Sequence, residues 1–269
     1  MMLKAVKDIV NYNEIVEKYN LKGGLTNNYI QNQADELIKK GSLYEFCTEY
    51  NAFFFVEKPI GFRVYYYIND LHEQVTFSSE SPLVTEILYR GQNFFPQQEV
   101  DFFQRCGFHS NLIRDQYAGV YKDLTAPHKN ANNIIRFAQT FEEVAEACHL
   151  FNNSFDALSG DFIPDSEFQN LFDGKNILVA TDANGRFCGA LHQTIERNVS
   201  WISHVAVIES ARGQHVGQSL VDAFVETNMT TEKSRYMFWV QHQNEVAVTM
   251  YQKKGFKYIG KSTISLIIK

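Results

Sequence analysis

The stretch from Val205 to Leu220 constrains the fold more than any other part of this 269-residue chain. An apolar strand leads directly into a loop that contains Arg212, Gly213 and Gly217, and the loop opens into an amphipathic helix. Glycines in such a turn let backbone N–H groups approach an anion closely, and the N-terminus of the next helix carries roughly half a positive charge. The pattern indicates a pyrophosphate-binding turn, and the alternative is that both glycines serve turn geometry only.

Length and composition are those of a globular protein with one large domain or two ordinary ones, since 45% of the residues are hydrophobic. The net charge of −6 is spread over both halves, which argues against a nucleic-acid partner. No segment approaches the ~20 apolar residues of a membrane helix, and the N-terminus carries charges throughout. We therefore expect a cytoplasmic protein without a membrane partner.

The four cysteines are widely scattered and form no C-x-x-C pair. This spacing indicates neither a disulfide framework nor a zinc site, and we expect no bound metal. The residues, predicted to be reduced core thiols, are Cys47, Cys106, Cys148 and Cys188.

The first half of the chain shows helical spacing, then strand-like runs, then helical spacing again. The predicted elements are helices within Met1 to Lys40 separated by Gly23-Gly24, a hairpin of Ala52 to Glu57 and Phe62 to Ile68, a strand from Leu83 to Tyr89, and a helix from Gln97 to Arg105. The polar segment Tyr121 to Asn133, which contains Pro127, is the expected linker.

The second half alternates helical and strand patterns around the glycine-containing loop. The predicted elements are helices at Phe141 to Phe155 and Asp165 to Phe172, strands at Ile177 to Thr181 and Phe187 to Ile195 with a turn at Asp182 to Gly185, a strand at Trp201 to Ile208, the helix after the loop, a strand at Tyr236 to Val240, a helix at Glu245 to Lys254, and closing strands at Phe256 to Ile259 and Thr263 to Ile268.

Two short segments of the chain match without a gap at a constant offset of 148 residues. Val100 to Phe108 aligns with Val248 to Phe256, and the identical or similar residues include the Gly-Phe pair that ends each segment. We infer an internal duplication, although two helix–glycine–strand junctions can also match by chance. Phe103 then occupies the position of Tyr251, so the first copy lacks its hydroxyl.

The loop Arg212 to Gly217 and the later residues Asn244, Tyr251, Gly255 and Phe256 together resemble the GNAT superfamily of N-acetyltransferases. That family binds acetyl-coenzyme A through a loop of pattern R/Q-x-x-G-x-G/A. It often follows this loop with an Asn, a helix bearing a Tyr, and a Gly-Phe. His215 departs from the pattern, because the family usually has glycine there.

The resemblance implies an α/β fold of mixed α+β type with tandem GNAT-like domains, each a mixed, mostly antiparallel sheet flanked by helices. Residues 1–125 would form a degenerate N-terminal domain, and residues 131–269 the acetyl-CoA-binding catalytic domain. In the first domain, Pro96 stands at the position of Asn244, and Asn69 to Pro82 contains no glycine. We therefore expect the first domain to be a scaffold or a substrate-side wall.

The resemblance also implies roles for individual residues. Backbone groups of the strand before the loop would bind the pantetheine arm, the loop amides would bind the diphosphate, and Tyr251 would be the catalytic general acid that protonates the leaving thiolate. Asn244 could contact the cofactor, cap its helix, or do both. The expected cofactor-binding residues are Val205, Ala206, Val207, Arg212, Gly213, Gln214, His215, Val216, Gly217, Gln218, Asn244 and Tyr251.

No general base follows from the sequence. By strand alternation, Trp201 and Ser203 should share a face with the last valines of their strand, and neither is a good base. His204 should lie on the opposite face, as a core or interface histidine. His192, Glu196 and a water chain all stay open as candidates.

The leading function hypothesis is an acyl-CoA-dependent N-acyltransferase, most simply one that moves acetyl from acetyl-CoA to a primary amine of a small or amino-acid-like substrate. One alternative is a non-catalytic acyl-CoA-binding or regulatory protein that has kept the loop. Another is an aminoacyl transferase, against which the acidic balance argues. We expect a monomer or a homodimer.

Overall fold

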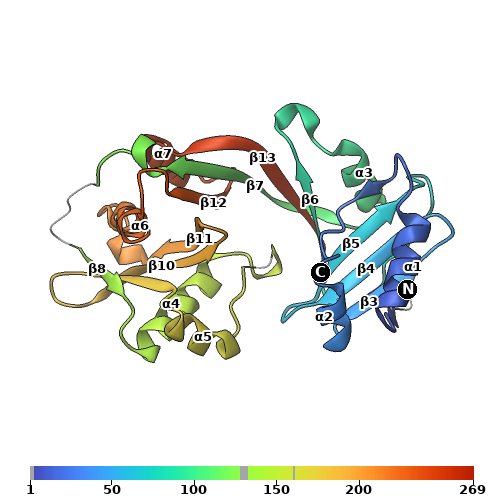
Figure 1. The fold of residues 1–269 in the computed structure, drawn as a ribbon, viewed down its shortest axis with the longest axis horizontal. Coiled ribbons are helices and arrows are strands. Elements are labelled where there is room, and N and C mark those ends of the chain that lie inside the picture. The colour runs from blue at the N-terminus through green and yellow to red at the C-terminus, as the bar shows by residue number, and fades with distance from the viewer. Residues whose placement is uncertain (1–2, 128–132, 160) are drawn as a thin grey trace. The chain divides into compact units, whose positions relative to one another are not determined.

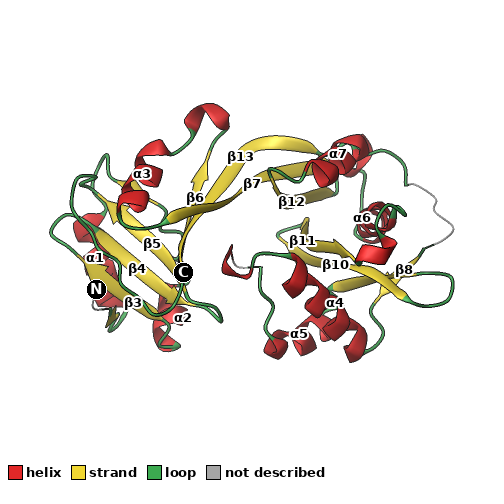
Figure 2. Cartoon of the chain, turned by 180° about the vertical axis from the view of Figure 1, so that it is seen from behind, coloured by secondary structure: helices red, strands yellow, loops and turns green. Residues whose placement is uncertain are grey.

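The computed structural model describes residues 3–127, 133–159 and 161–269, and divides into two compact units. Unit 1 comprises Met1–Ile113 with Lys261–Lys269, and unit 2 comprises Arg114–Gly260. Figures 1 and 2 show the elements of each unit. These limits differ from the domain limits of 125 and 131 expected from the sequence. Residues 128–132, which include part of the expected linker and the start of the expected second domain, lie outside the described residues.

Unit 2 is built on a sheet of strand order β8-β9-β10-β11-β12-β7. Neighbours are antiparallel except for β11 and β12, which are parallel. The elements are β7 (His109–Val120, of which the part from Arg114 belongs to unit 2), β8 (Ile134–Phe137), α4 (Phe141–Ser154), α5 (Phe168–Asp173), β9 (Ile177–Thr181), β10 (Phe187–Glu196), β11 (Val199–Val207), α6 (Val216–Thr227), β12 (Arg235–Gln241) and α7 (Glu245–Lys254).

The helices of unit 2 cover both faces of its sheet, as Figure 1 shows for α4 and α5 on one face and α6 on the other. Each face has its own apolar core. Phe151 of α4 packs in one core with Ala190 and Ala206 of the sheet. Phe224 of α6 packs in the other with Leu191 and with residues of α7. Burial of these stripes fixes α6 against the sheet.

Unit 1 repeats this arrangement. Its sheet order is β1-β3-β4-β5-β6-β13, and only β5 and β6 are parallel. Beyond this order, β2 pairs with β5. The elements are β1 (Lys4–Ala5), α1 (Ile9–Tyr19), β2 (Leu25–Thr26), α2 (Ala34–Lys39), β3 (Leu43–Cys47), β4 (Ala52–Glu57), β5 (Phe62–Ile68), β6 (Leu83–Tyr89), α3 (Gln97–Arg105) and the end of β13 (Lys257–Ile268).

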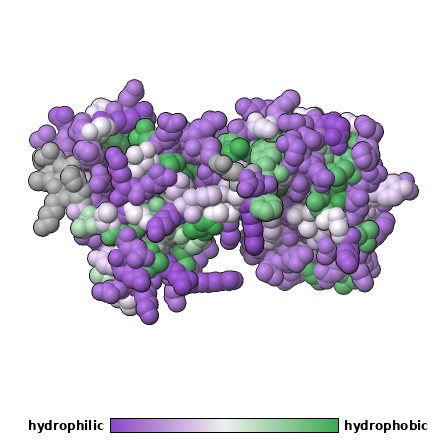
Figure 3. All heavy atoms as spheres, turned by 90° about the horizontal axis from the view of Figure 1, so that it is seen from above, coloured by the Kyte–Doolittle hydropathy of each residue, from purple (hydrophilic) through white to green (hydrophobic). Residues whose placement is uncertain are grey.

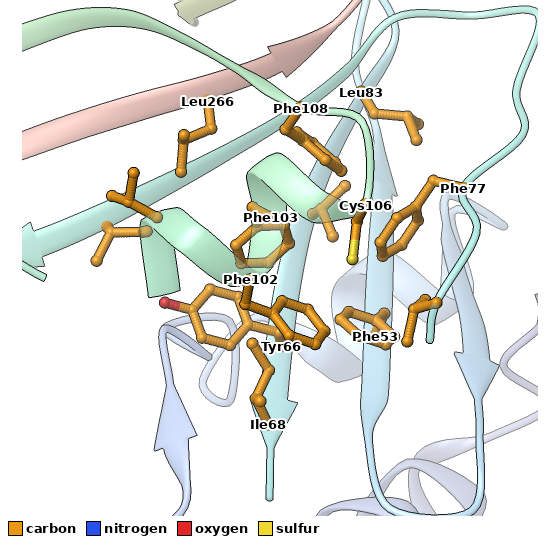
Figure 4. Packing of buried hydrophobic residues seen from close by; sticks show 14 of the residues in the cluster. Phe53, Tyr66, Ile68, Phe77, Leu83, Phe102, Phe103, Cys106, Phe108 and Leu266 are labelled. Carbon is orange, nitrogen blue, oxygen red and sulfur yellow. The ribbon is translucent and has the colours of Figure 1, made fainter. Parts of the chain in front are cut away.

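Aromatic side chains dominate the core between α3 and the sheet of unit 1. Figure 4 shows Phe102 and Phe103 of α3 facing Phe53 and Tyr66 of the sheet. The rings of Phe103 and Tyr66 are 5.0 Å apart and meet edge to face, the geometry that aromatic pairs prefer. Phe103 is fully buried, so it acts here as a packing residue.

The strand orders confirm that the fold is a tandem of GNAT-like units. Each unit has antiparallel strands, then one parallel pair, then an antiparallel closing strand. The repeat holds at the level of single positions in the aligned helices. Pro96 is the N-cap of α3, and Asn244 is the N-cap at the equivalent position of α7. After the helices, Gly107 and Gly255 have φ values of 94° and 103°. Only glycine adopts this backbone easily, which explains why both copies keep it.

Several elements differ from the sequence predictions. The strands β1, β2, β3, β7 and β8 were not predicted, and the two predicted closing strands form the single strand β13. Gly260 lies inside β13 with a φ of 74°. This local irregularity led to the prediction of two separate strands in place of one. Predicted bounds agree with those found for β4, β5, β6, β9, α3 and α7.

The face in Figure 3 is mostly hydrophilic, with smaller apolar areas between the polar side chains. Among the described residues, no helix has the length and apolar character needed to cross a bilayer. The same residues include no group of three or more His, Cys, Asp or Glu placed to hold a metal ion. All the cysteines are free, and every one except Cys47 is buried.

A buried ion pair joins α6 to α7. The Nζ of Lys254 lies 2.6 Å from an Asp222 carboxylate oxygen, and both side chains are about 95% buried. The Nζ also donates to the Thr125 carbonyl at 2.7 Å. The pair therefore fixes the helix that bears Tyr251 against the helix that follows the glycine-containing loop.

Removing one partner of this pair should be strongly destabilising. We expect Lys254→Met to lower the free energy of unfolding by about 3–5 kcal/mol, because Asp222 is left buried without its counter-charge. The double variant Lys254→Met/Asp222→Leu should recover much of this loss. Urea unfolding of both variants measures the effect, and a loss below about 1 kcal/mol in the single variant would contradict a buried, structurally important pair.

Candidate functional site

The parallel strands of unit 2 part at their midpoint. Pairing between β11 and β12 runs from Val199 opposite Arg235 to Ile202 opposite Phe238 and ends there. Both strands continue, β11 to Val207 and β12 to Gln241. On its other edge β11 stays paired with β10 as far as Val207. The backbone of β11 beyond Ile202 therefore has one edge that β12 does not cover. We call this feature the β11–β12 opening.

A bulge lies where the opening begins. His192 of β10 pairs with His204, and Gln193 pairs with Ile202, so Ser203 is the extra residue. The bulge reverses the alternation of side chains along β11. Ile202 consequently packs in the same core as Val205 and Val207. The predicted alternation, which placed Trp201 and Ser203 on that face, is wrong for this reason.

The side chains at the end of β11 pack in the apolar cores on the two faces of the sheet. Val205 and Val207 pack on the α6 side of the sheet, and Ala206 packs on the α4 side. Only the backbone of these three residues is left for binding a ligand at the opening. A strand edge of this kind can bind an extended ligand through its N–H and C=O groups.

The N-terminus of α6 follows the opening along the chain. The structure gives the backbone N–H groups of Val216, Gly217 and Gln218 no acceptor among the described residues. These are the donors that every helix leaves unpaired in its first turn, and the helix dipole adds positive potential there. Ser219 is the first residue of the helix whose N–H is bonded, to the His215 carbonyl at 3.0 Å.

His215 explains why the GNAT pattern has glycine at its position. It is the residue before α6 and has a φ of 60° and a ψ of 15°, in the left-handed region that favours glycine. Its side chain is exposed. The substitution therefore costs backbone strain of about 1–2 kcal/mol but leaves the backbone of the loop in the conformation that glycine would adopt.

The rest of the loop presents polar groups to solvent. Arg212 is exposed, and its guanidinium has no partner among the described residues. Gly213 has a φ of 77°, and an added Cβ would meet no atom within 4 Å. The Gln214 side chain donates to the Ser210 carbonyl at 3.0 Å and braces the turn. The guanidinium of Arg212 and the unbonded N–H groups at the start of α6 thus lie within a few residues of each other in the sequence.

Tyr251 lies beside the point where the strands part. Its ring centroid is 4.0 Å from that of Phe238, the last residue of β12 that pairs with β11. The side chain is 6% exposed, and burial raises its pKa, so the hydroxyl is protonated at neutral pH. The hydroxyl has no hydrogen-bond partner among the described residues. Packing therefore positions Tyr251, and its proton is available to another group.

Asn244 caps α7. Its Oδ1 accepts from the Ala247 N–H at 3.1 Å, and the residue is exposed. The cap explains one of the two roles considered for this residue, since Asn is a preferred N-cap. The structure gives the Nδ2 group of Asn244 no partner among the described residues. Contact with the cofactor is therefore compatible with the capping role.

The two histidines near the opening form a buried pair. The Nδ1 atoms of His192 and His204 lie 3.2 Å apart, so one ring donates and the other accepts. His204 stacks on Phe151 of α4, on the face opposite Val205, as predicted. Burial lowers the pKa of His192 to about 4 and that of His204 to about 3. Both are therefore neutral and weak bases, and neither suits the removal of a proton from an ammonium group.

The low pKa values of the pair predict acid sensitivity. In the unfolded chain these imidazoles take up protons near pH 6.5, whereas the folded chain takes them up only near pH 3 to 4. Stability is therefore complete above pH 6.5 and falls as the pH drops through this window, by up to about 1.4 kcal/mol per pH unit per proton. Asp161 pairs with Arg114 at 3.1 Å and lies 4.0 Å from the Nε2 of His204.

Urea unfolding between pH 7 and pH 4.5 measures this dependence. His204→Phe should flatten the slope, because it removes one titrating ring and leaves an aromatic side chain against Phe151. His149→Gln is the matched control, since His149 lies on α4, the helix that bears Phe151, but is exposed. An unchanged slope in His204→Phe would contradict the assignment to the buried pair.

Two features of the site were missed in the sequence. Gly189 of β10 lies against the end of β11, where an added Cβ would approach the Ala206 carbonyl oxygen to 2.6 Å. A lone glycine inside a strand pattern signals such close approach, so this residue could have been found. Phe238 supports Tyr251, but nothing in the sequence distinguishes it from other core aromatic residues.

Comparison with known proteins identifies the family. Residues 139–266 match the family model for the acetyltransferase (GNAT) domain. This part of the chain belongs to the GNAT superfamily, and unit 1 repeats the same fold. No curated protein sequence matches the chain significantly.

Solved structures match over most of the chain at low sequence identity. A GCN5-related N-acetyltransferase from Sphaerobacter thermophilus has a TM-score of 0.58 and 12% identity, with 81% of this chain and 76% of that chain covered. A GNAT-family acetyltransferase from Colwellia psychrerythraea has a TM-score of 0.53 and 12% identity over 100% of both chains. A tandem GNAT protein from the clavulanic acid biosynthesis pathway has a TM-score of 0.55 and 11% identity, covering 84% and 82%. At these low identities, the similarity is one of fold.

Proposed function

We propose that unit 2 is an acyl-CoA-dependent N-acyltransferase that moves an acetyl group from acetyl-CoA to a primary amine of a small or amino-acid-like substrate. The observation that carries this proposal is the conjunction of three features in one GNAT domain. These are the β11–β12 opening, the free amides at the start of α6, and the protonated Tyr251 beside the point where the strands part.

Unit 2 has a group suited to bind each part of acetyl-CoA, the acetyl donor. The diphosphate would lie at the amides of Val216 to Gln218, with Arg212 as an added positive charge. The pantetheine arm carries amide groups, and these would pair with the uncovered backbone of β11 from Val205 to Val207. The amides of Gly213, Gln214 and His215 belong to the same turn.

The reaction that this arrangement suits is direct attack. The acceptor nitrogen forms a bond to the thioester carbonyl carbon, the C–S bond breaks, and the sulfur leaves with the bonding electron pair. Tyr251 donates its hydroxyl proton to that sulfur. The amine loses its proton to solvent, because the buried pair of His192 and His204 is too weakly basic to accept it. Tyr251 regains a proton from solvent once the thiol has left.

The test is an acetyl-transfer assay of the full chain with acetyl-CoA and a panel of small primary amines and amino acids. Release of the CoA thiol, with mass-spectrometric detection of the N-acetyl product, is the expected result for at least one class of amine. A chain that binds acetyl-CoA but acetylates none of them would favour the alternative of a non-catalytic acyl-CoA-binding protein. A chain that binds no CoA would overturn both functions.

A further inference from the structure

Unit 1 contains an opening equivalent to that of unit 2. Its parallel strands β5 and β6 pair from Phe62 opposite Leu83 to Val64 opposite Thr85, and pairing ends there although both strands continue. In each unit the parallel pair holds the same place in the strand order, between an antiparallel strand and the closing strand. We call this feature the β5–β6 opening.

A segment of the chain itself fills the β5–β6 opening. Strand β2 runs antiparallel to the end of β5, with Leu25 opposite Ile68 and Thr26 opposite Tyr67. The Thr26 hydroxyl also donates to the Tyr66 carbonyl at 2.7 Å. The backbone of β5 beyond Val64 is thus covered by an extended segment.

Asn27 bridges β5 and β6 at the point where the pairing of these strands ends. Its Oδ1 accepts from the Tyr66 N–H at 2.8 Å, and its Nδ2 donates to the Glu86 carbonyl at 2.9 Å and to the Thr85 hydroxyl at 3.2 Å. One side-chain amide therefore bridges β5 and β6 just where their own pairing ends. Asn27 is 2% exposed, so the bridge is formed in the interior and its polar atoms are satisfied.

The next residue anchors the segment. The Nδ2 of Asn28 donates to the hydroxyl groups of Tyr12 and Tyr67 at 2.8 and 2.9 Å. Tyr12 belongs to α1 and Tyr67 to β5, so the segment is held from both sides. Buried, mutually satisfied hydrogen bonds of this kind specify one arrangement.

We propose that residues 25–28 are an internal occupant of the β5–β6 opening, and that the chain consequently binds a single acyl-CoA, in unit 2. This inference rests on the proposed function. An extended segment that pairs with a strand edge and contributes amide hydrogen bonds is the chemical counterpart of a pantetheine arm, so the two compete for the same groups. Unit 1 also has no helix in residues 69–82, where α6 would provide the diphosphate amides.

Native mass spectrometry of the full chain with excess CoA counts the bound molecules directly. We expect one CoA per chain for the unsubstituted protein and none for Gly217→Asp, which places a negative charge at the unit 2 site. Two CoA molecules on the unsubstituted chain, with one retained by Gly217→Asp, would overturn the inference alone. No CoA on either protein would overturn the proposed function and the inference with it. Circular dichroism checks that the variant is folded.

Discussion

Tyr251→Phe should lower kcat for acetyl transfer by about 10²- to 10³-fold, because it removes only the hydroxyl group that we propose as the proton donor for the leaving sulfur. The phenylalanine ring keeps the contacts with Phe238 and Phe256. The lost hydroxyl has no hydrogen-bond partner among the described residues, so the fold should lose little stability. KM for acetyl-CoA and the affinity for free CoA should change by less than about threefold, an effect well under 1 kcal/mol.

Tyr236→Phe is the matched control for this experiment. Tyr236 is another buried tyrosine of unit 2, and its hydroxyl donates to the Val225 carbonyl at 2.9 Å. Its loss should cost about 1 kcal/mol of stability and leave kcat nearly unchanged. If Tyr251→Phe keeps the kcat of the unsubstituted chain, or if both variants lose activity equally, Tyr251 is not the general acid.

Gly217→Asp should weaken CoA binding at least about 100-fold. Gly217 is the second residue of α6, and a carboxylate there faces the place proposed for the diphosphate. Two unit charges about 4 Å apart near a protein surface repel by roughly 4 kcal/mol, and each 1.4 kcal/mol is a factor of ten. The same carboxylate is favourable for an isolated helix start, so the variant should fold normally.

Gly217→Ala separates the effect of charge from that of bulk. A Cβ at this position would lie 3.7 Å from a Val207 methyl group, which is an ordinary contact. The GNAT loop pattern also admits alanine here. Isothermal titration with CoA should therefore give an affinity within a few-fold of that of the unsubstituted chain. Equal weakening in both variants would point to a steric effect, and no weakening in Gly217→Asp would remove α6 from the site.

The sequence was sufficient for the parts of the fold that local patterns determine. The strand Ile177–Thr181 begins with four consecutive apolar residues and ends at a turn signal, and the helix Glu245–Lys254 has an Asn cap and a following glycine. The loop before α6 was found because arginine and glycines follow an apolar strand. The helical repeat at α3 and α7 was visible because glycine and phenylalanine recur at a fixed offset.

The remaining features depend on contacts between residues that are distant in the sequence. The bulge at Ser203 exists only in the pairing with β10, so strand alternation along β11 could not reveal it. Strand β7 was missed because its sequence mixes charged and apolar residues, and its burial comes from its neighbours. Asn27 reaches groups about 40 and 60 residues away, and no local pattern marks an asparagine as a bridge between strands.

Hydrogen–deuterium exchange of the full chain with and without CoA tests the central claim most directly, because it locates the ligand on the backbone. The account predicts slower exchange for Val216 to Gln218 and for those amides of Val205 to Val207 that are not bonded to β10. It predicts no change at Tyr65 to Ile68 of unit 1, where β2 already covers the strand. CoA that binds without slowing exchange in residues 205–218, or that slows it at β5 instead, would contradict the assignment of the site.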